Sequence, residues 1–243
     1  MNKATIYLKD IKLFDVSDLS LNDYWTNLPF YKKLSAGYKM NFESPVTFIV
    51  GENGSGKSTL IEAIAVALGF NAEGGSKNFN FSTFDTTSNL HEYLITSKIS
   101  HEKDGFFLRA ESFYNVASNI EQLNINVNCY GGKSLHSQSH GESFLSLIQN
   151  RFRGNGLYIL DEPEAALSPM RQLTLLIEME RLIRDGSQFI IATHSPIILS
   201  FPNACIYNID LGIETIEYEN TEHYTLTKTF LNNHKEFIKK LLL

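Results

Sequence analysis

The residues with the clearest chemical potential form a glycine-rich segment at residues 51–59. Gly51 to Ser58 match the spacing GxxxxGK[ST], in which glycines let successive backbone N–H groups turn inward around a phosphate. Lys57 would reach the β- and γ-phosphates of a nucleotide, and the Ser58 hydroxyl would ligate magnesium. A glycine turn that only caps a helix is the alternative. The strand-like run before this segment and the helix-like run after it favour phosphate binding.

Two adjacent carboxylates, Asp161 and Glu162, end the apolar run 157–160. A carboxylate delivered to the end of a strand can hold magnesium, which is the role expected of Asp161. Glu162 can orient and deprotonate a water that attacks the γ-phosphate. The alternative is an acidic helix cap after an ordinary strand. Because a phosphate-binding loop precedes the pair, a nucleotide-hydrolysis site is favoured.

His194 follows a second apolar run, 188–192, in a similar position. An imidazole there can donate a hydrogen bond to the γ-phosphate or to the attacking water. A structural histidine is the alternative. If the runs 157–160 and 188–192 are neighbouring parallel strands, their carboxyl ends meet, and that placement favours the functional interpretation.

Ser139, Gly141 and Glu142 precede an apolar helical pattern and form a second candidate anion-binding helix end. A plain capped helix is the alternative. Two phosphate-binding helix ends exceed what one ATP needs. This surplus suggests that the second end serves the ATP of a partner subunit.

These residues require a scaffold of strands and helices. The runs 46–50, 157–160 and 188–192 are largely apolar without a polar–apolar alternation, as buried parallel strands are. A helix is expected from Lys57, and another from Ser168 and Pro169 to Gly186. For the second helix we predict an apolar face of Leu173, Leu176, Ile177 and Ile183. Such alternation of strands and helices predicts a largely parallel sheet covered by helices on both faces.

The rest of the chain gives weaker patterns. Strands are expected at 4–14, 123–129, 204–209 and 213–218, with two more in 93–109 around a turn at 103–105. Helices are expected towards residue 230, and the end 235–243 is expected to form a packed terminal helix. For adenine stacking the sequence leaves several aromatic residues open, namely Trp25, Phe30, Tyr31 and Tyr38.

In this order, the phosphate loop, SHGES, LYILDEPEAALSP and THS resemble the motifs of the ATP-binding cassette (ABC) ATPases. More closely, GENGSGKST, DEPEAALSP and ATHSP look like small stand-alone predicted ATPases grouped near the SMC and OLD families. The resemblance implies an α/β P-loop NTPase with a mainly parallel sheet flanked by helices, an antiparallel N-terminal sheet and a short helical lobe. It implies one domain over 1–243, with the reduced lobe at about 112–153.

By that resemblance, Glu162 is the general base, His194 senses the γ-phosphate, and Asp161 and Ser58 hold magnesium. Ser139, Gly141 and Glu142 act across the interface of a head-to-tail dimer that sandwiches two ATPs. The phosphate-binding residues carried over are Gly51, Asn53, Gly54, Ser55, Gly56, Lys57, Ser58 and Thr59. Glu111 stands where the family places a glutamine that contacts magnesium or water. The signature also lacks the LSGGQ spelling, and Ala166–Ser168 lacks the transporter family's aspartate.

Composition bounds the remaining choices. The 243 residues carry a net charge of −6, with 43% hydrophobic residues and two cysteines. Two cysteines exclude a disulfide framework, and no run is long enough for a membrane span, so we expect a cytoplasmic protein. The acidic balance and the thin basic clusters at 32–33, 151–153 and 239–240 make DNA a weakly supported partner.

The leading expectation is a soluble ATPase that acts through an ATP-sandwich dimer in DNA maintenance or phage defence. One alternative is a slow-hydrolysing, ATP-gated switch that binds a partner protein. A transporter ATPase subunit is less favoured, because the chain between Glu111 and Ser139 is short for the helical lobe that contacts membrane subunits.

Overall fold

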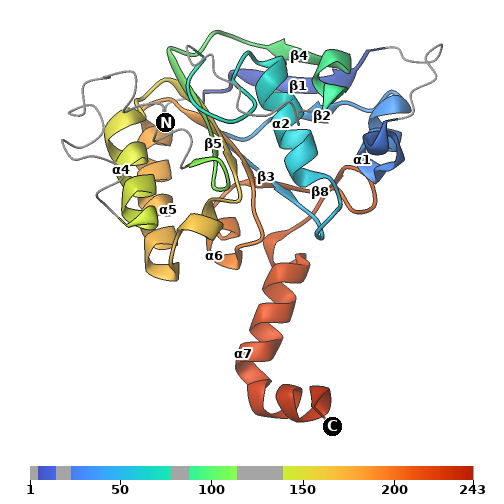
Figure 1. The fold of residues 1–243 in the computed structure, drawn as a ribbon, viewed down its shortest axis with the longest axis vertical. Coiled ribbons are helices and arrows are strands. Elements are labelled where there is room, and N and C mark those ends of the chain that lie inside the picture. The colour runs from blue at the N-terminus through green and yellow to red at the C-terminus, as the bar shows by residue number, and fades with distance from the viewer. Residues whose placement is uncertain (1–4, 15–22, 78–87, 114–138, 243) are drawn as a thin grey trace.

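The computed structural model describes residues 5–14, 23–77, 88–113 and 139–242. A six-stranded sheet has the order β5-β6-β7-β3-β8-β9, and a three-stranded sheet has the order β2-β1-β4. The strands are β1 (Leu8–Leu13), β2 (Met40–Asn41), β3 (Val46–Val50), β4 (Leu94–Lys98), β5 (Asp104–Arg109), β6 (Gly156–Asp161), β7 (Gln188–Ala192), β8 (Cys205–Asn208) and β9 (Glu214–Thr215). Figure 1 shows the smaller sheet lying over α2.

The helices are α1 (Pro29–Ser35), α2 (Lys57–Ala67), α4 (His140–Arg151), α5 (Pro169–Arg184), α6 (Pro196–Leu199) and α7 (Glu222–Leu241). Short 3₁₀ turns include η1 (Tyr24–Asn27), η5 (Pro163–Ala166) and η6 (Tyr218–Asn220). Strands β5, β6, β7, β3 and β8 are parallel to their neighbours, whereas β9 is antiparallel to β8. The predicted α/β fold with a mainly parallel sheet and a small antiparallel sheet is therefore confirmed.

The larger sheet is buried on both faces because its strands alternate between two hydrophobic cores. Phe48 and Leu160 face a core that includes α4, α5 and α6. Ile49 and Ile159 face a second core that includes α1, α2 and the smaller sheet. This is why the central strands read as unbroken apolar runs. Asp161, Glu162 and His194 lie at or just after the carboxyl ends of β6 and β7, where the site lies.

Helix α5 forms where predicted, but half of its predicted apolar face is wrong. Leu173 is 46% exposed and Ile177 is 69% exposed. The buried residues lie on a neighbouring stripe and are Gln172, Leu175, Met179 and Leu182. The helix carries apolar residues on two stripes, and packing against the sheet selects one of them.

Two other sequence predictions need correction. Asp104 and Gly105 belong to β5, so the turn lies before them, and the flanking strands join different sheets. The predicted helix at 235–243 is not packed against the described residues: it forms the end of α7, which contains no buried residue and projects from the body of the molecule (Figure 1). The predicted strand at 123–129 and much of the predicted lobe at 112–153 lie outside the described residues.

Candidate active site

The loop between β3 and α2 is shaped by glycines at positions where a side chain does not fit. Gly56 has φ 93°, and a Cβ atom there would lie 2.6 Å from Leu28 Cδ1 and 2.7 Å from Phe30 Cε1. Gly54 also has a left-handed backbone, with φ 85°. The carboxylate of Asp210 accepts a hydrogen bond from the Glu52 N–H at 2.8 Å and so ties the loop to the chain beyond β8.

Lys57 lies over this loop at the start of α2 and is only 4% exposed. Its Nζ donates hydrogen bonds to the carbonyl oxygens of Gly51 at 2.9 Å and Glu52 at 2.8 Å. Burial lowers the pKa of Lys57, whereas the carboxylates of Glu162 and Asp210 oppose that shift. The loop therefore presents one ammonium group, held by main-chain oxygens, beside the first turn of a helix.

Ser58 and Asp161 come together from α2 and β6. The Ser58 hydroxyl donates to Asp161 Oδ1 at 3.3 Å. Burial raises the pKa of Asp161 to about 7, against the opposing charge of Arg109. A hydroxyl and a carboxylate at this spacing are a donor pair suited to Mg²⁺, which commonly takes few protein ligands and completes its shell with phosphate and water. Among the described residues, no group of three or more His, Cys, Asp or Glu side chains is arranged to hold a metal ion.

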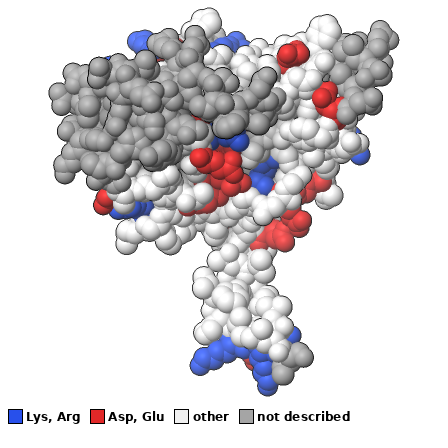
Figure 2. Space-filling model, viewed as in Figure 1, with Lys and Arg blue, Asp and Glu red and all other residues white. Residues whose placement is uncertain are grey.

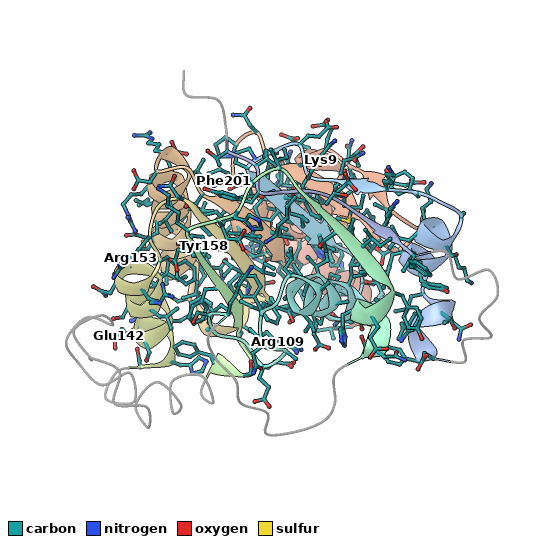
Figure 3. The ribbon with its side chains drawn as sticks, turned by 90° about the horizontal axis from the view of Figure 1, so that it is seen from above. Lys9, Arg109, Glu142, Arg153, Tyr158 and Phe201 are labelled. Carbon is teal, nitrogen blue, oxygen red and sulfur yellow. The ribbon has the colours of Figure 1, made fainter. Side chains whose placement is uncertain are left out.

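Arg109, at the end of β5, is a site residue that sequence analysis missed. Its Nε lies 3.4 Å from Asp161 Oδ2, and its Nη1 donates to Glu62 on α2. Its partner at a longer distance is Glu111, whose Oε2 lies 4.0 Å from Nη2 and whose side chain is 86% exposed. The sequence signal for Arg109 was its place directly after the apolar run 106–108. Figure 3 shows Arg109 and Glu142 along the same side of the molecule.

Glu162 directly follows Asp161 and has a left-handed backbone, with φ 49° and ψ 53°. Its N–H donates to Ala192 O at 2.9 Å, so the turn after β6 is fastened to β7. Its Oε1 lies 3.6 Å from His194 Nε2. The neighbouring parallel strands thus bring the predicted base and the predicted histidine side by side.

His194 is held mainly through its backbone. Its N–H donates to Glu164, whose other carboxylate oxygen accepts from the Thr193 hydroxyl at 2.7 Å. Burial lowers the pKa of His194 to about 4, aided by the charge of Lys57 and by His223. The imidazole is therefore neutral at pH 7. Three buried polar atoms near the site, His194 Nε2, Ser55 Oγ and Arg109 Nε, are among those with no hydrogen-bond partner within the described ranges.

Ser139, Gly141 and Glu142 form the N-terminal end of α4, away from the β3–α2 loop in sequence. The Glu142 carboxylate accepts from the Ser139 N–H at 3.0 Å and from its hydroxyl at 2.7 Å. Arg171 of α5 lies 3.0 Å from Glu142. A Cβ atom on Gly141 would lie 2.7 Å from Ala166 O, so this end packs closely against the turn that follows β6.

A cavity of about 380 Å³ lies beside the loop and is lined by Tyr24, Leu28, Asn53, Gly54, Gly56, Lys57, Ser58, Thr59 and Glu162. Tyr24 is the aromatic residue among them. It is 62% exposed, and its OH lies 3.2 Å from Thr59 Oγ1. The aromatic residues suggested by the sequence differ: Trp25, Phe30 and Tyr31 are buried in the core beneath the smaller sheet, and Tyr38 packs against that core. Tyr24 was not recognised because the sequence did not show which aromatic side chains stay outside the core.

The fold and this edge of the sheet define a class, the P-loop NTPases. An inward-facing metal-chelate type ABC transporter superposes with a TM-score of 0.51 over 93% of this chain and 88% of that chain, at 15% identity. The SMC head domain from Thermotoga maritima superposes with a TM-score of 0.46, covering 87% of this chain and all of that one, at 18% identity. The profile of an AAA domain family matches residues 31–240. The chain belongs to this AAA domain family.

Two curated relatives match shorter stretches of the chain. The "Retron Vc95 probable ATPase" of Vibrio cholerae serotype O1 biovar El Tor is 33% identical over 93 residues, which are 37% of this chain and 15% of that protein. The chromosome partition protein Smc of Halothermothrix orenii is 51% identical over 39 residues, which are 16% of this chain and 3% of that protein. The matched regions are therefore small parts of both relatives. Within the described part of this chain, no helix is long and apolar enough to cross a bilayer.

Proposed function

We propose that this protein binds ATP with magnesium and hydrolyses it to ADP and phosphate. One observation carries the proposal: a single edge of the sheet holds Lys57 over a glycine loop, Ser58 against Asp161, and Glu162 against His194. The unpartnered Ser55 hydroxyl and His194 Nε2 offer polar contacts to a ligand at this edge. Membership of the AAA domain family supports the same assignment.

Each residue has a role in this proposal that its surroundings allow. Gly51, Asn53, Gly54, Ser55, Gly56 and Thr59 form the phosphate cradle, and Lys57 turns its Nζ from main-chain oxygens to the β- and γ-phosphates. Ser58 and Asp161 hold magnesium, which neutralises phosphate charge when it is bound. Tyr24 offers a ring for stacking with the base at the side of the cavity. Glu111, exposed and paired with Arg109, is a weaker candidate for a contact to magnesium or water.

For the chemical step, Glu162 accepts a proton from the attacking water, and neutral His194 donates a hydrogen bond to the γ-phosphate or that water. A neutral imidazole keeps one N–H to donate and adds no charge that would pair permanently with Glu162. The lowered pKa of His194 supports this role.

We further propose that two chains sandwich the nucleotides, with Ser139, Gly141 and Glu142 of one chain completing the site of the other. In one chain this helix end contacts Ala166 and Arg171, and not the phosphate loop, among the contacts described. The relatives named for retron and chromosome-partition proteins are compatible with work in phage defence or DNA maintenance in the cytoplasm. We propose one of these two processes as the setting of the protein, with DNA or a partner protein as its binding partner.

Steady-state phosphate release, measured with Mg²⁺ and ATP, with and without DNA, tests the activity. Release that is lost in Glu162→Gln and in Lys57→Ala would support the site. Tight ATP binding with negligible release by the wild type would favour the ATP-gated switch. Absence of both binding and release would overturn the proposal.

A further inference from the structure

Among the described residues, the hydrogen bonds and ring contacts that join helix α7 to the body of the molecule lie at its start. Thr221, just before it, is 1% exposed, and its hydroxyl accepts from the Tyr224 N–H at 3.4 Å. Beyond this root every described residue of α7 is partly or fully exposed. Figure 2 shows a shaft that is largely free of charge, with acidic residues near its root and lysines at its far end. A structural change in the candidate active site can therefore reach α7 through the contacts at the beginning of this helix.

The root contacts the loop that carries His194. The rings of His194 and His223 lie 4.8 Å apart between centroids, at an interplanar angle of 75°. Two residues after His194, the Pro196 carbonyl accepts a hydrogen bond from the Tyr218 hydroxyl at 2.9 Å. Tyr218 in turn packs against Tyr224 of α7, with centroids 4.6 Å apart. Two separate contacts thus join the loop after β7 to the beginning of α7.

The ring of His223 contacts the part of His194 that no hydrogen bond to a described residue holds, namely its imidazole ring. Its backbone is fixed by Glu164, but its Nε2 has no hydrogen-bond partner within the described ranges. The last torsion of a histidine side chain has broad energy wells, so an imidazole without such a bond needs a packed neighbour to hold its plane. The edge-to-face ring of His223 supplies that neighbour and leaves Nε2 aimed towards Glu162, 3.6 Å away.

We propose that His223 is a positioning residue for His194, and that this contact couples the γ-phosphate end of the site to the orientation of α7. The proposal rests on the proposed ATPase function. His223 does not touch the reacting atoms; it sets the plane in which His194 meets them. Ligand contacts that shift the His194 ring change its packing against the His223 ring, and that change reaches the beginning of α7.

Variants of His223 test the positioning role by kinetics. His223→Ala should lower kcat about 10-fold and leave KM within about 2-fold, as expected when a group is misplaced only in the transition state. His223→Phe keeps a ring and should recover most of the lost kcat. His234→Ala, a histidine on the exposed part of the same helix, is the matched control and should behave as the wild type. Unchanged kcat in His223→Ala, or equal loss in His223→Ala and His223→Phe, would overturn the role.

An NMR comparison separates this proposal from the proposed function. The His194 ring resonances of the nucleotide-free protein should shift in His223→Ala and stay fixed in His234→Ala. If the wild type releases no phosphate, the proposed function fails, while this comparison still decides whether His223 positions His194. Unshifted His194 resonances in His223→Ala would refute the contact.

Hydrogen–deuterium exchange tests the coupling to α7. In Glu162→Gln, Mg²⁺ and ATP should change exchange at residues 222–232, and adding His223→Ala should remove that change while ATP binding, measured by titration, is retained. The same change in both proteins would contradict the coupling.

Discussion

Glu162 combines a carboxylate with a left-handed backbone, a conformation that costs a non-glycine residue energy and is concentrated at functional sites. Glutamine keeps the size of the side chain and can still hydrogen-bond a water, but it cannot accept a proton as a carboxylate does. We expect Glu162→Gln to lower phosphate release by about 100-fold or more while ATP binding is retained. Single-turnover assays with saturating ATP measure this. Near wild-type release would remove Glu162 as the base.

Lys57 is the cation that the loop holds through two main-chain carbonyls. Lys57→Ala removes the charge aimed at the phosphates and creates little change in the apolar cores, so we expect tight ATP binding to be lost. Nucleotide titration of the folded variant measures the effect. Lys32→Ala, on the exposed part of α1, serves as the control and should bind normally. Wild-type affinity in Lys57→Ala would refute the site assignment.

His194 gives a prediction about pH. Its folded-state pKa of about 4 lies below the ordinary value of 6.5, because burial and the charges of Lys57 and His223 disfavour the imidazolium, against Asp210. The unfolded chain therefore binds more protons between these pH values, and stability falls as pH drops from about 6.5 towards about 4. Above pH 7 His194 is neutral in both the folded and the unfolded state, so it makes no pH-dependent contribution to stability there.

His194→Gln should therefore reduce the loss of thermal stability on acidification of the nucleotide-free protein. At pH 5 we expect its Tm to exceed that of the wild type by about 2–4 °C. This is the shift for about 1 kcal/mol of unfolding free energy in a chain of this size, a value kept small because solvent screens the partly exposed imidazole. At pH 8 the difference should vanish. His101→Gln, at an exposed loop position, controls for the loss of a histidine side chain. Equal Tm differences at both pH values would contradict the assignment.

At the scale of elements, we predict that the Ser139 end of α4 is needed for ATP hydrolysis but not for ATP binding by a single chain. The Ser139 end of α4 packs against η5 and α5, while the phosphate loop begins α2. Ser139→Arg should spare ATP binding by the single chain and stop hydrolysis, because it blocks the surface offered to the opposite subunit. Ser139 is the better test position, since any side chain at Gly141 would meet the Ala166 carbonyl.

Asn150→Arg places the same charge at the exposed far end of α4 and should leave hydrolysis unchanged. Binding is measured at low protein concentration, where chains are separate, and phosphate release at high concentration. Loss of binding by Ser139→Arg at low concentration would contradict the division of labour between α2 and α4.

At the scale of the whole molecule, uncleaved ATP should favour association. If ATP bridges Lys57 of one chain and Ser139 of another, its binding energy stabilises the dimer by mass action. Glu162→Gln should therefore be a dimer with Mg²⁺ and ATP, and a monomer or a looser assembly without them. Light scattering at micromolar protein measures this, and cross-linking of the two heads decides it if the chain is already dimeric. Unchanged mass and unchanged cross-linking in a variant that binds ATP would rule out the sandwich.

The sequence by itself determined the local chemistry and the class of fold. Apolar runs followed by Asp161 and by His194 favour buried parallel strands whose carboxyl ends meet, and β6 and β7 pair in that way. A glycine spacing such as 51–58 favours its own backbone conformation, because left-handed positions such as Gly54 and Gly56 cost a residue with a side chain more energy than they cost glycine. These features depend on residues close together in the chain, so pattern alone could predict them. The roles of the site residues remain predictions.

Only the tertiary structure decided which side chains meet across the chain. Arg109 reaches Asp161 and Glu62 because β5 lies beside β6, a pairing that no local pattern encodes. Helix α5 carried two apolar stripes, and packing chose the one with Leu175 and Met179. His223 contacts His194, and α7 projects although the sequence predicted a packed terminal helix. Both features depend on where the chain leaves β8 and β9 and enters α7. Long-range packing settles such questions because each choice depends on surfaces contributed by distant residues.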